Sequence, residues 1–194
     1  MSTTYILHGG ETSKESESNS RFFKEFTANS QKQEIKILMC YWARKIEDWE
    51  RLFARDLAKI TEQTTKTVVC ELTQNPKDLL EKLYDFDVLY VAGGDAFRIE
   101  PLYKDLQDLK TLLAGKVFVG SSMGAFLASE NYVLSLTGQN ETEVHHGLGL
   151  LPINTLCHWD PEKFKTRKLQ LLSESAANLT ILTLDEGQFA KFVH

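Results

Sequence analysis

The chain has 194 residues, of which 42% are hydrophobic and 25% charged, so it is long enough to bury the core of a globular domain. Its net charge of -5 argues against nucleic acids and anionic membranes as partners, because both attract basic surfaces. No apolar run approaches the roughly 20 residues of a membrane span, and the N-terminal residues lack the pattern of a signal peptide. The three cysteines fit neither a zinc site nor a disulfide framework. We therefore expect a cytoplasmic protein that needs no metal or other cofactor.

Short apolar runs alternate with longer amphipathic stretches through the first two thirds of the chain. The runs predict strands over residues 5–7, 35–40, 67–72, 88–92 and 116–119. The stretches between them predict helices over residues 21–31, 49–61, 76–84 and 97–113, after an exposed loop at 11–20. The run at 88–92 is continuously apolar, which is typical of a strand buried on both faces of a parallel sheet.

The last third of the chain contains two further apolar runs. Residues 153–156 and 179–184 predict strands, with a helix near 163–173 between them, while 131–146 shows no clear period. We find no internal repeat, low-complexity tract or linker. The alternation of strands and helices predicts one α/β domain over residues 1–194, in which helices cover both faces of a mostly parallel sheet.

Two glycine-rich segments follow predicted strands, where parallel sheets gather their functional residues. One contains Gly93 and Gly94; the other, residues 120–124, has the pattern G-x-S-x-G with Ser122 at its centre. In this pattern the serine occupies a sharp strand-to-helix turn that exposes its hydroxyl, and the flanking glycines let strand and helix pass closely. The sequence therefore indicates a nucleophilic serine. The alternative is an ordinary turn in which a serine caps the helix, a role that Ser121 would fill equally well.

A serine nucleophile needs a base, and the chain has five histidines. His145 and His146 lie in a polar segment, and His194 is the last residue. His8 and His158 each follow a predicted strand and so belong to the same sheet edge as Ser122. We predict His158 as the partner of Ser122.

Four segments, taken together and in order, resemble the dipeptidase E and cyanophycinase family of serine peptidases. They are residues 90–97, 120–125, 147–152 with 157–159, and 184–187, whose sequences are YVAGGDAF, GSSMGA, GLGLLP with CHW, and LDEG. The resemblance covers about half of the chain. It implies a three-layer α/β/α fold with a flavodoxin-like sheet, similar to class I glutamine amidotransferases.

The resemblance also implies residue roles. Ser122 would be the nucleophile and His158 the general base of a Ser-His-acid triad, and the N–H groups of Gly94 and Met123 would form the oxyanion hole. The chain departs from the family pattern at Met123, where alanine is usual, and at Asp95-Ala96, where Asn-Thr is usual. A negative charge on Asp95 would oppose an oxyanion unless the side chain points away or pairs with a cation such as Arg98.

The triad acid is the least defined part of the pattern. The family spacing leads to Leu136 and Thr137, which cannot serve, although Glu141 and Glu143 lie nearby. Asp160 is a second candidate, two residues after His158, where the amidotransferases carry their acid. Glu143 and Asp160 remain alternatives.

The leading prediction is a serine peptidase of short peptides. Arg167 and Lys168 match the arginine-bearing motif of aspartyl dipeptidases only loosely, so we do not predict aspartyl specificity. The principal alternative is a catalytically inactive, amidotransferase-like binding or regulatory protein; esterase or acyl-transfer chemistry at the same serine is a third. A homodimer is left open.

Overall fold

The computed structural model describes residues 1–134, 143–160, 167–176 and 178–194. Its larger sheet has the strand order β10-β1-β5-β4-β2-β3, and every neighbouring pair is parallel except β10 and β1. The strands are β1 (Thr4–His8), β2 (Glu34–Cys40), β3 (Thr67–Leu72), β4 (Val88–Val91), β5 (Val117–Ser121) and β10 (Phe189–Val193). All five strands predicted before residue 120 therefore form, and they form one mostly parallel sheet.

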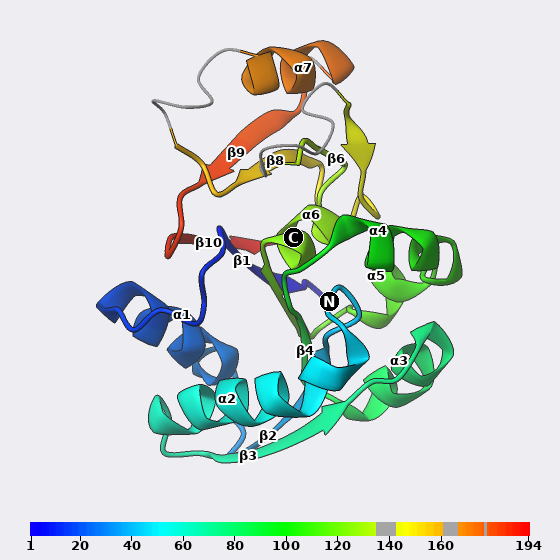
Figure 1. Cartoon of the computed structure of the whole chain (residues 1–194). Helices are drawn as coiled ribbons and strands as arrows, with labels where there is room; N and C mark the ends of the chain where they lie inside the picture. Colours follow the sequence, from blue (N-terminus) through cyan, green and yellow to red (C-terminus); the bar gives the residue numbers. More distant parts are fainter. Residues whose placement is uncertain (135–142, 161–166, 177) are drawn as a thin grey trace.

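Helices cover both faces of this sheet (Figure 1). One face carries α1 (Glu17–Ala28) and α2 (Trp49–Glu62); the other carries α3 (Pro76–Lys82), α4 (Ala96–Ile99), α5 (Leu109–Leu112) and α6 (Met123–Ala128). Along β4, Val88 and Tyr90 pack with the first group, whereas Leu89 and Val91 pack with the second. Because successive side chains of a strand point to opposite faces, this division defines three layers and confirms the predicted α/β/α fold.

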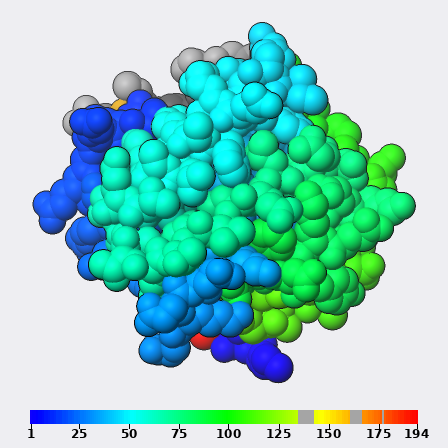
Figure 2. Space-filling view, turned by 90° about the horizontal axis from the view of Figure 1, so that it is seen from below, coloured from blue at the N-terminus to red at the C-terminus, as the bar shows by residue number. Residues whose placement is uncertain are grey.

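One edge strand of the larger sheet is β3, whose side chains alternate between exposed and half-buried. Seen from below, the surface is formed mainly by the middle of the chain, from α2 and β3 to α3 (Figure 2). None of the helices in the described parts of the chain is long and apolar enough to cross a bilayer.

Two predicted helices differ from the observed ones. α1 begins at Glu17, inside the predicted loop, because the Ser16 side chain accepts a hydrogen bond from the Asn19 N–H and caps the helix. The helix predicted over 97–113 is divided into α4, a 3-10 helix (Glu100–Asp105) and α5. The break follows from Pro101, whose ring clashes with the preceding turn and which has no N–H to donate. Two further 3-10 helices cover Ile46–Asp48 and Leu83–Asp85.

Four strands in the last third of the chain form a separate sheet in the order β7-β6-β8-β9, whereas β10 joins the larger one. Its strands are β6 (Asn131–Tyr132), β7 (His145–His146), β8 (Ile153–Cys157) and β9 (Thr180–Leu184). α7 (Arg167–Ser175) covers it, and Leu172 is buried there against Val133 and Leu156 (Figure 1). Residues 163–166, where we predicted the start of this helix, lie outside the described residues.

The carboxyl ends of the two sheets meet at Gly9 and Gly10. The Gly9 carbonyl accepts a hydrogen bond from the His158 N–H at 3.0 Å, and the Gly10 carbonyl accepts one from the Gly187 N–H at 3.1 Å. Gly9 approaches the segment after β9 so closely that an added Cβ would lie 2.1 Å from the Asp185 carbonyl oxygen. The ends of β1, β5, β8 and β9 are thereby brought to one edge of the molecule.

Candidate active site

Ser122 lies between β5 and α6 in a conformation that residues with side chains seldom adopt, with φ 50° and ψ -103°. Its N–H donates to the His8 carbonyl on the neighbouring strand at 2.8 Å, which holds the turn. The Ser122 side chain makes no capping hydrogen bond to α6. The hydroxyl is instead presented to a surface cavity, so the turn has the geometry of a nucleophile elbow and not of an ordinary helix cap.

Three glycines make this turn possible. A Cβ on Gly120 would lie 2.5 Å from the Gly124 carbonyl, and one on Gly124 would lie 2.0 Å from the Val91 carbonyl oxygen. A Cβ on Gly93 would lie 2.9 Å from the Cβ of Ser122. The spacing of glycines in the sequence therefore reflects real close approaches between β5, α6 and the end of β4.

His158 follows β8 and points its imidazole at Ser122. Its Nε2 atom lies 2.9 Å from the Ser122 Oγ, a hydrogen-bond distance. His158 also has a positive φ of 52°, and its N–H donates to the Gly9 carbonyl. The structure thus brings together the two residues that the sequence selected, from different sheets.

The imidazole of His158 rests on Gly10. A Cβ on Gly10, whose φ is 123°, would lie 2.2 Å from the Cε1 atom of His158. The Gly10 N–H donates to Nδ1 of His8 at 3.0 Å, so the other nitrogen of His8 carries the proton and donates to the Asn19 side chain at 2.9 Å. Burial lowers the pKa of His8 to about 4. His8 is therefore a neutral, buried support for the Gly10 turn.

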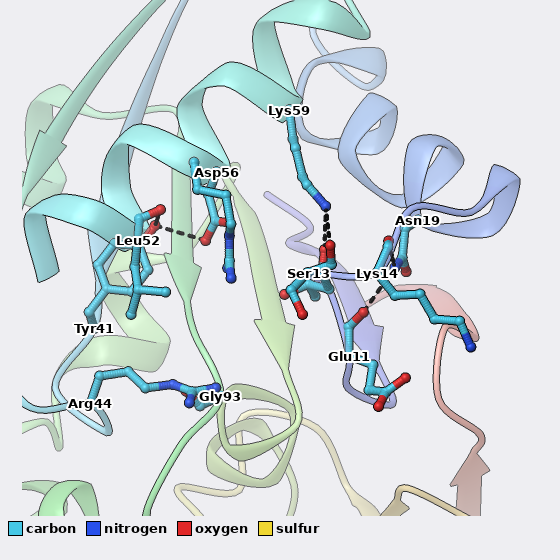
Figure 3. A network of polar contacts seen from close by, with 12 residues as sticks. Glu11, Ser13, Lys14, Asn19, Tyr41, Arg44, Leu52, Asp56, Lys59 and Gly93 are labelled. Atoms are coloured by element: carbon cyan, nitrogen blue, oxygen red, sulfur yellow. Dashed lines mark hydrogen bonds and ion pairs between the residues drawn. The ribbon is translucent and has the colours of Figure 1, made fainter. Parts of the chain in front are cut away.

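The segment that follows Gly10 is held from both sides. The Asn19 amide donates to the carbonyls of Glu11 and Lys14, and Lys59 donates to the carbonyls of Thr12 and Ser13 (Figure 3). These bonds fix a loop that would otherwise be free to move at the edge of the site.

The carboxylate next to His158 is Glu186, which neither of our predictions named. Its Oε1 atom lies 3.0 Å from Nδ1 of His158. Of the predicted acids, Glu143 is exposed just before β7, and Asp160 is half-buried two residues after His158; Glu141 lies outside the described residues. Glu186 therefore joins Glu143 and Asp160 as a candidate for the triad acid. Glu186 lies in the LDEG segment, directly after β9, so the rule that located His158 at the end of a strand also applied to it.

Two residues that line the Ser122 cavity have backbone N–H groups of interest. Within the described residues, the Gly94 N–H donates no hydrogen bond to the chain. Met123 is the first residue of α6, and the N–H groups of a first helical turn have no acceptor within the helix. Gly94, Met123 and Ser122 all line one cavity.

The charge of Asp95 is engaged elsewhere. Its Oδ1 atom accepts a hydrogen bond from the Phe97 N–H at 3.0 Å and caps α4, and its Oδ2 atom lies 3.6 Å from Nε of Arg98. Because Arg98 offsets part of the negative charge of Asp95, this carboxylate repels an oxyanion at Ser122 less than an unpaired carboxylate would.

The cavity at Ser122 has a volume of about 470 Å³. Cationic and anionic side chains share its wall with apolar ones. Its lining comprises Ala43, Arg44, Lys45, Asp48, Gly94, Asp95, Ala96, Arg98, Ser122, Met123, Phe126, Leu134 and His158. Within the described ranges, no group of three or more His, Cys, Asp or Glu side chains is placed to hold a metal ion.

A serine on a strand-to-helix turn, in contact with a histidine at the carboxyl edge of a parallel sheet, defines the class of α/β serine hydrolases. Comparison with known proteins gives the family. The model of peptidase family S51 matches residues 5–193, and the chain belongs to this family, which includes dipeptidase E. It is a serine-type peptidase.

The relatives and solved structures agree with this assignment. The chain is 26% identical over 178 residues to the uncharacterized peptidase Lmo0363 of Listeria monocytogenes, covering 86% of this chain and 85% of the relative. It is 26% identical over 169 residues to the uncharacterized peptidase Lin0382 of Listeria innocua, covering 81% and 79%.

Two crystal structures share the fold, each with a TM-score of 0.65. One is a candidate peptidase E from Listeria monocytogenes EGD-e, at 18% identity, covering 100% of this chain and 98% of that chain. The other is a peptidase from an acI-B1 Actinobacterium, at 16% identity, covering 98% and 83%.

Proposed function

We propose that this peptidase cleaves short peptides through a triad of Ser122, His158 and Glu186. The observation that carries the proposal is the 2.9 Å distance between the Ser122 Oγ and the His158 Nε2. A serine hydroxyl is a weak nucleophile until a base at hydrogen-bond distance accepts its proton, and His158 occupies that position.

Glu186 sets the protonation of the base. With Nδ1–H of His158 donating to the Glu186 carboxylate, Nε2 is left as an acceptor for the serine proton. The same carboxylate stabilises the imidazolium that forms when His158 takes up this proton.

The reaction then proceeds in two halves. Ser122 attacks the carbonyl of the scissile peptide bond, and His158 gives the proton to the departing amine, which leaves an acyl-serine. Water, activated by the same histidine, hydrolyses the ester and restores the hydroxyl. The N–H groups of Gly94 and Met123 stabilise the oxyanion in each half; loss of one such donor typically lowers kcat about 10²- to 10³-fold.

The cavity supports a short substrate. Its volume of about 470 Å³ lies in the range of sites for small ligands, roughly 300 to 1,000 Å³. The exposed Lys45 in its wall offers a cationic partner for the carboxylate end of a short peptide.

Three features of the sequence favour an inactive binding protein: the undefined triad acid, Asp95 and Met123. In the proposed reaction Glu186 serves as the acid, and Asp95 is paired with Arg98. Met123 contributes its N–H group regardless of its side chain, which is buried.

The test compares Ser122→Ala with Ser121→Ala. Ser121 is the preceding residue, is buried and has no role in the proposed reaction, so it controls for disturbance of the turn. Both variants and the wild type are assayed on a library of peptides of about two to four residues and on an unfolded protein, and are treated with a fluorophosphonate probe.

We expect the wild type and Ser121→Ala to cleave the short peptides and to label with the probe. Ser122→Ala should lose at least about 10³-fold in kcat and should not label. Equal cleavage by Ser122→Ala would refute the proposal, as would a native wild type that does not label. Preferential cleavage of the unfolded protein would refute the short-peptide part alone.

A further inference from the structure

We propose that Arg44 is a positioning residue that holds the Gly93–Gly94 peptide group with its N–H directed at the oxyanion; this inference rests on the proposed function. Arg44 follows β2 and is separate in sequence from every residue that the proposed reaction uses. Its Nε atom donates to the Gly93 carbonyl oxygen at 2.5 Å, and Figure 3 shows the extended side chain reaching this residue.

The direction of the Gly94 N–H follows from the geometry of the peptide bond. The described chain contains no cis peptide bond, so the Gly93 C=O and the Gly94 N–H point to opposite sides of one rigid plane. Because Arg44 holds the carbonyl on one side, the N–H is turned to the other. Gly94 lines the cavity that also contains Ser122, and its N–H donates no hydrogen bond within the described residues.

A second contact prevents the glycine turn from rotating about this anchor. The Asp95 N–H donates to the Ala43 carbonyl at 2.8 Å, so residues 43 and 44 hold the turn on both sides of Gly94. The two segments are in close contact, since a Cβ on Gly94 would lie 2.2 Å from the Ala43 carbonyl oxygen. A side chain at position 94 would therefore force them apart.

The Arg44 backbone is itself fixed. Its N–H donates to the Tyr41 carbonyl at 2.7 Å, and its carbonyl accepts from the Trp49 indole N–H at 3.2 Å. The segment that presents the guanidinium is thus tied both to the end of β2 and to the start of α2.

Arg44 also acts on the strength of the N–H donor. A hydrogen bond from a cation to a peptide carbonyl polarises that peptide, which makes its N–H a better donor to a developing anion. Arg44 also lines the cavity, but the role inferred here requires only its hydrogen bond to the Gly93 carbonyl and no contact with the substrate. The role is therefore one of orientation and polarisation, acting through Gly94.

The test uses three variants. Arg44→Met removes the donor and the charge but keeps much of the length of the side chain; Arg44→Lys keeps a cationic donor. Arg51→Met is the matched control, because Arg51 is an exposed arginine at the start of α2 that pairs with Asp48 and does not line the cavity.

We expect Arg44→Met to lower kcat about 10- to 100-fold with KM changed less than about threefold, because loss of a whole oxyanion donor costs about 10²- to 10³-fold. Arg44→Lys should recover part of the loss, and Arg51→Met should stay within about twofold of the wild type. A peptide aldehyde, which forms a tetrahedral adduct, should bind Arg44→Met more weakly in proportion to the fall in kcat/KM.

Other outcomes would overturn the inference. An increase in KM at unchanged kcat would make Arg44 a substrate-binding residue, and a wild-type kcat in Arg44→Met would give it no role. A crystal structure of Arg44→Met provides a readout independent of activity: the Gly93–Gly94 peptide should be rotated or present in more than one orientation. An unchanged peptide refutes the inference even if Ser122→Ala has already refuted the proposed reaction.

Discussion

The two sheets contribute to the site in different ways. Ser122 belongs to the six-stranded sheet, which has a buried core on each face, and its position is set locally by glycines and by the neighbouring strand. His158 belongs to the four-stranded sheet, whose outer cluster of fully buried side chains is small, and its neighbour Glu186 follows the last strand of that sheet. The proposed nucleophile is thus positioned by one strand-to-helix turn, whereas the contact of His158 and Glu186 with it depends on how two sheets meet.

Next to the site, the two sheets are joined by backbone hydrogen bonds of Gly9 and Gly10 with His158 and Gly187, and the His158 imidazole rests on Gly10. Away from the site, apolar side chains of both sheets pack into one buried cluster. A small displacement of this junction would separate the imidazole from Ser122 without unfolding either sheet. Changes at the junction should therefore reduce activity more than stability, and the following predictions test this difference.

The largest effect is expected from His158→Asn. Asparagine tolerates the positive φ of 52° better than most residues but cannot reach Ser122 as a base. We expect kcat to fall about 10⁴-fold or more, with a melting temperature close to that of the wild type. The control is His194→Asn at the exposed C-terminal residue, and a His158→Asn enzyme that keeps a tenth of the wild-type kcat would contradict the assignment.

A smaller loss is expected from Gly10→Ala. The added Cβ would lie 2.2 Å from the imidazole and would push it away from Ser122. A displacement of about 1 Å can lower activity about 10²-fold. Gly115→Ala is the matched control, because Gly115 also has a positive φ, of 78°, but its Cβ would meet only the flexible Met1 side chain.

Both alanine variants should lose stability through backbone strain, which circular dichroism melting would measure. Only Gly10→Ala should lose kcat. If the two variants lose activity to the same degree at matched stability, the Gly10 contact does not position the base.

The sequence predicts five strands of the six-stranded sheet because each is an apolar run with a clear boundary, but it did not predict the sixth, β10. It could not predict that α1 begins at Glu17, which depends on one capping bond from Ser16, and the effect of Pro101 was overlooked although the residue is visible. The separation of the second sheet depends on strand pairing between distant segments, which no local pattern specifies.

The residues of the site likewise divide into those that a local sequence pattern predicts and those that depend on contacts between distant segments. Ser122 and His158 could be selected because each follows a predicted strand, and the turn at Ser122 has its own glycine pattern. Glu186 also follows a strand, but its contact with His158 requires β9 to pair with β8 and the chain to turn at Gly187. Glu143 and Asp160 were suggested by spacing along the chain, whereas Glu186, the acid that we propose, follows the strand paired with β8.

His8 links stability to pH at the junction. Its pKa is about 4 in the folded protein because of burial, against about 6.5 in an unfolded chain. Between these values the unfolded state binds more protons, so the free energy of unfolding falls as the pH is lowered from about 6.5 towards 4, by up to about 3 kcal/mol. Above about pH 6.5 this group adds no pH dependence.

Urea unfolding of the wild type and of His8→Asn, at pH 7.5 and at pH 4.5, measures this contribution. Asparagine can still accept a hydrogen bond but does not titrate, so the variant should lose less stability on acidification than the wild type. An equal loss in both proteins would show that His8 does not titrate as its burial implies.

The smallest effect is expected from Glu186→Gln. The Glu186 side chain is 48% exposed, so water weakens its interaction with His158, and we expect kcat to fall only about 10- to 100-fold at nearly constant KM. Glu143→Gln and Asp160→Asn are made in parallel, since these are the acids that the sequence suggested. Each of the three variants removes one carboxylate charge and preserves the shape of the side chain. Any difference in kcat between them therefore reflects where the carboxylate lies. A loss confined to Glu186→Gln would assign the acid to the turn after β9, whereas a larger loss in either of the other two would return it to the segments near His158.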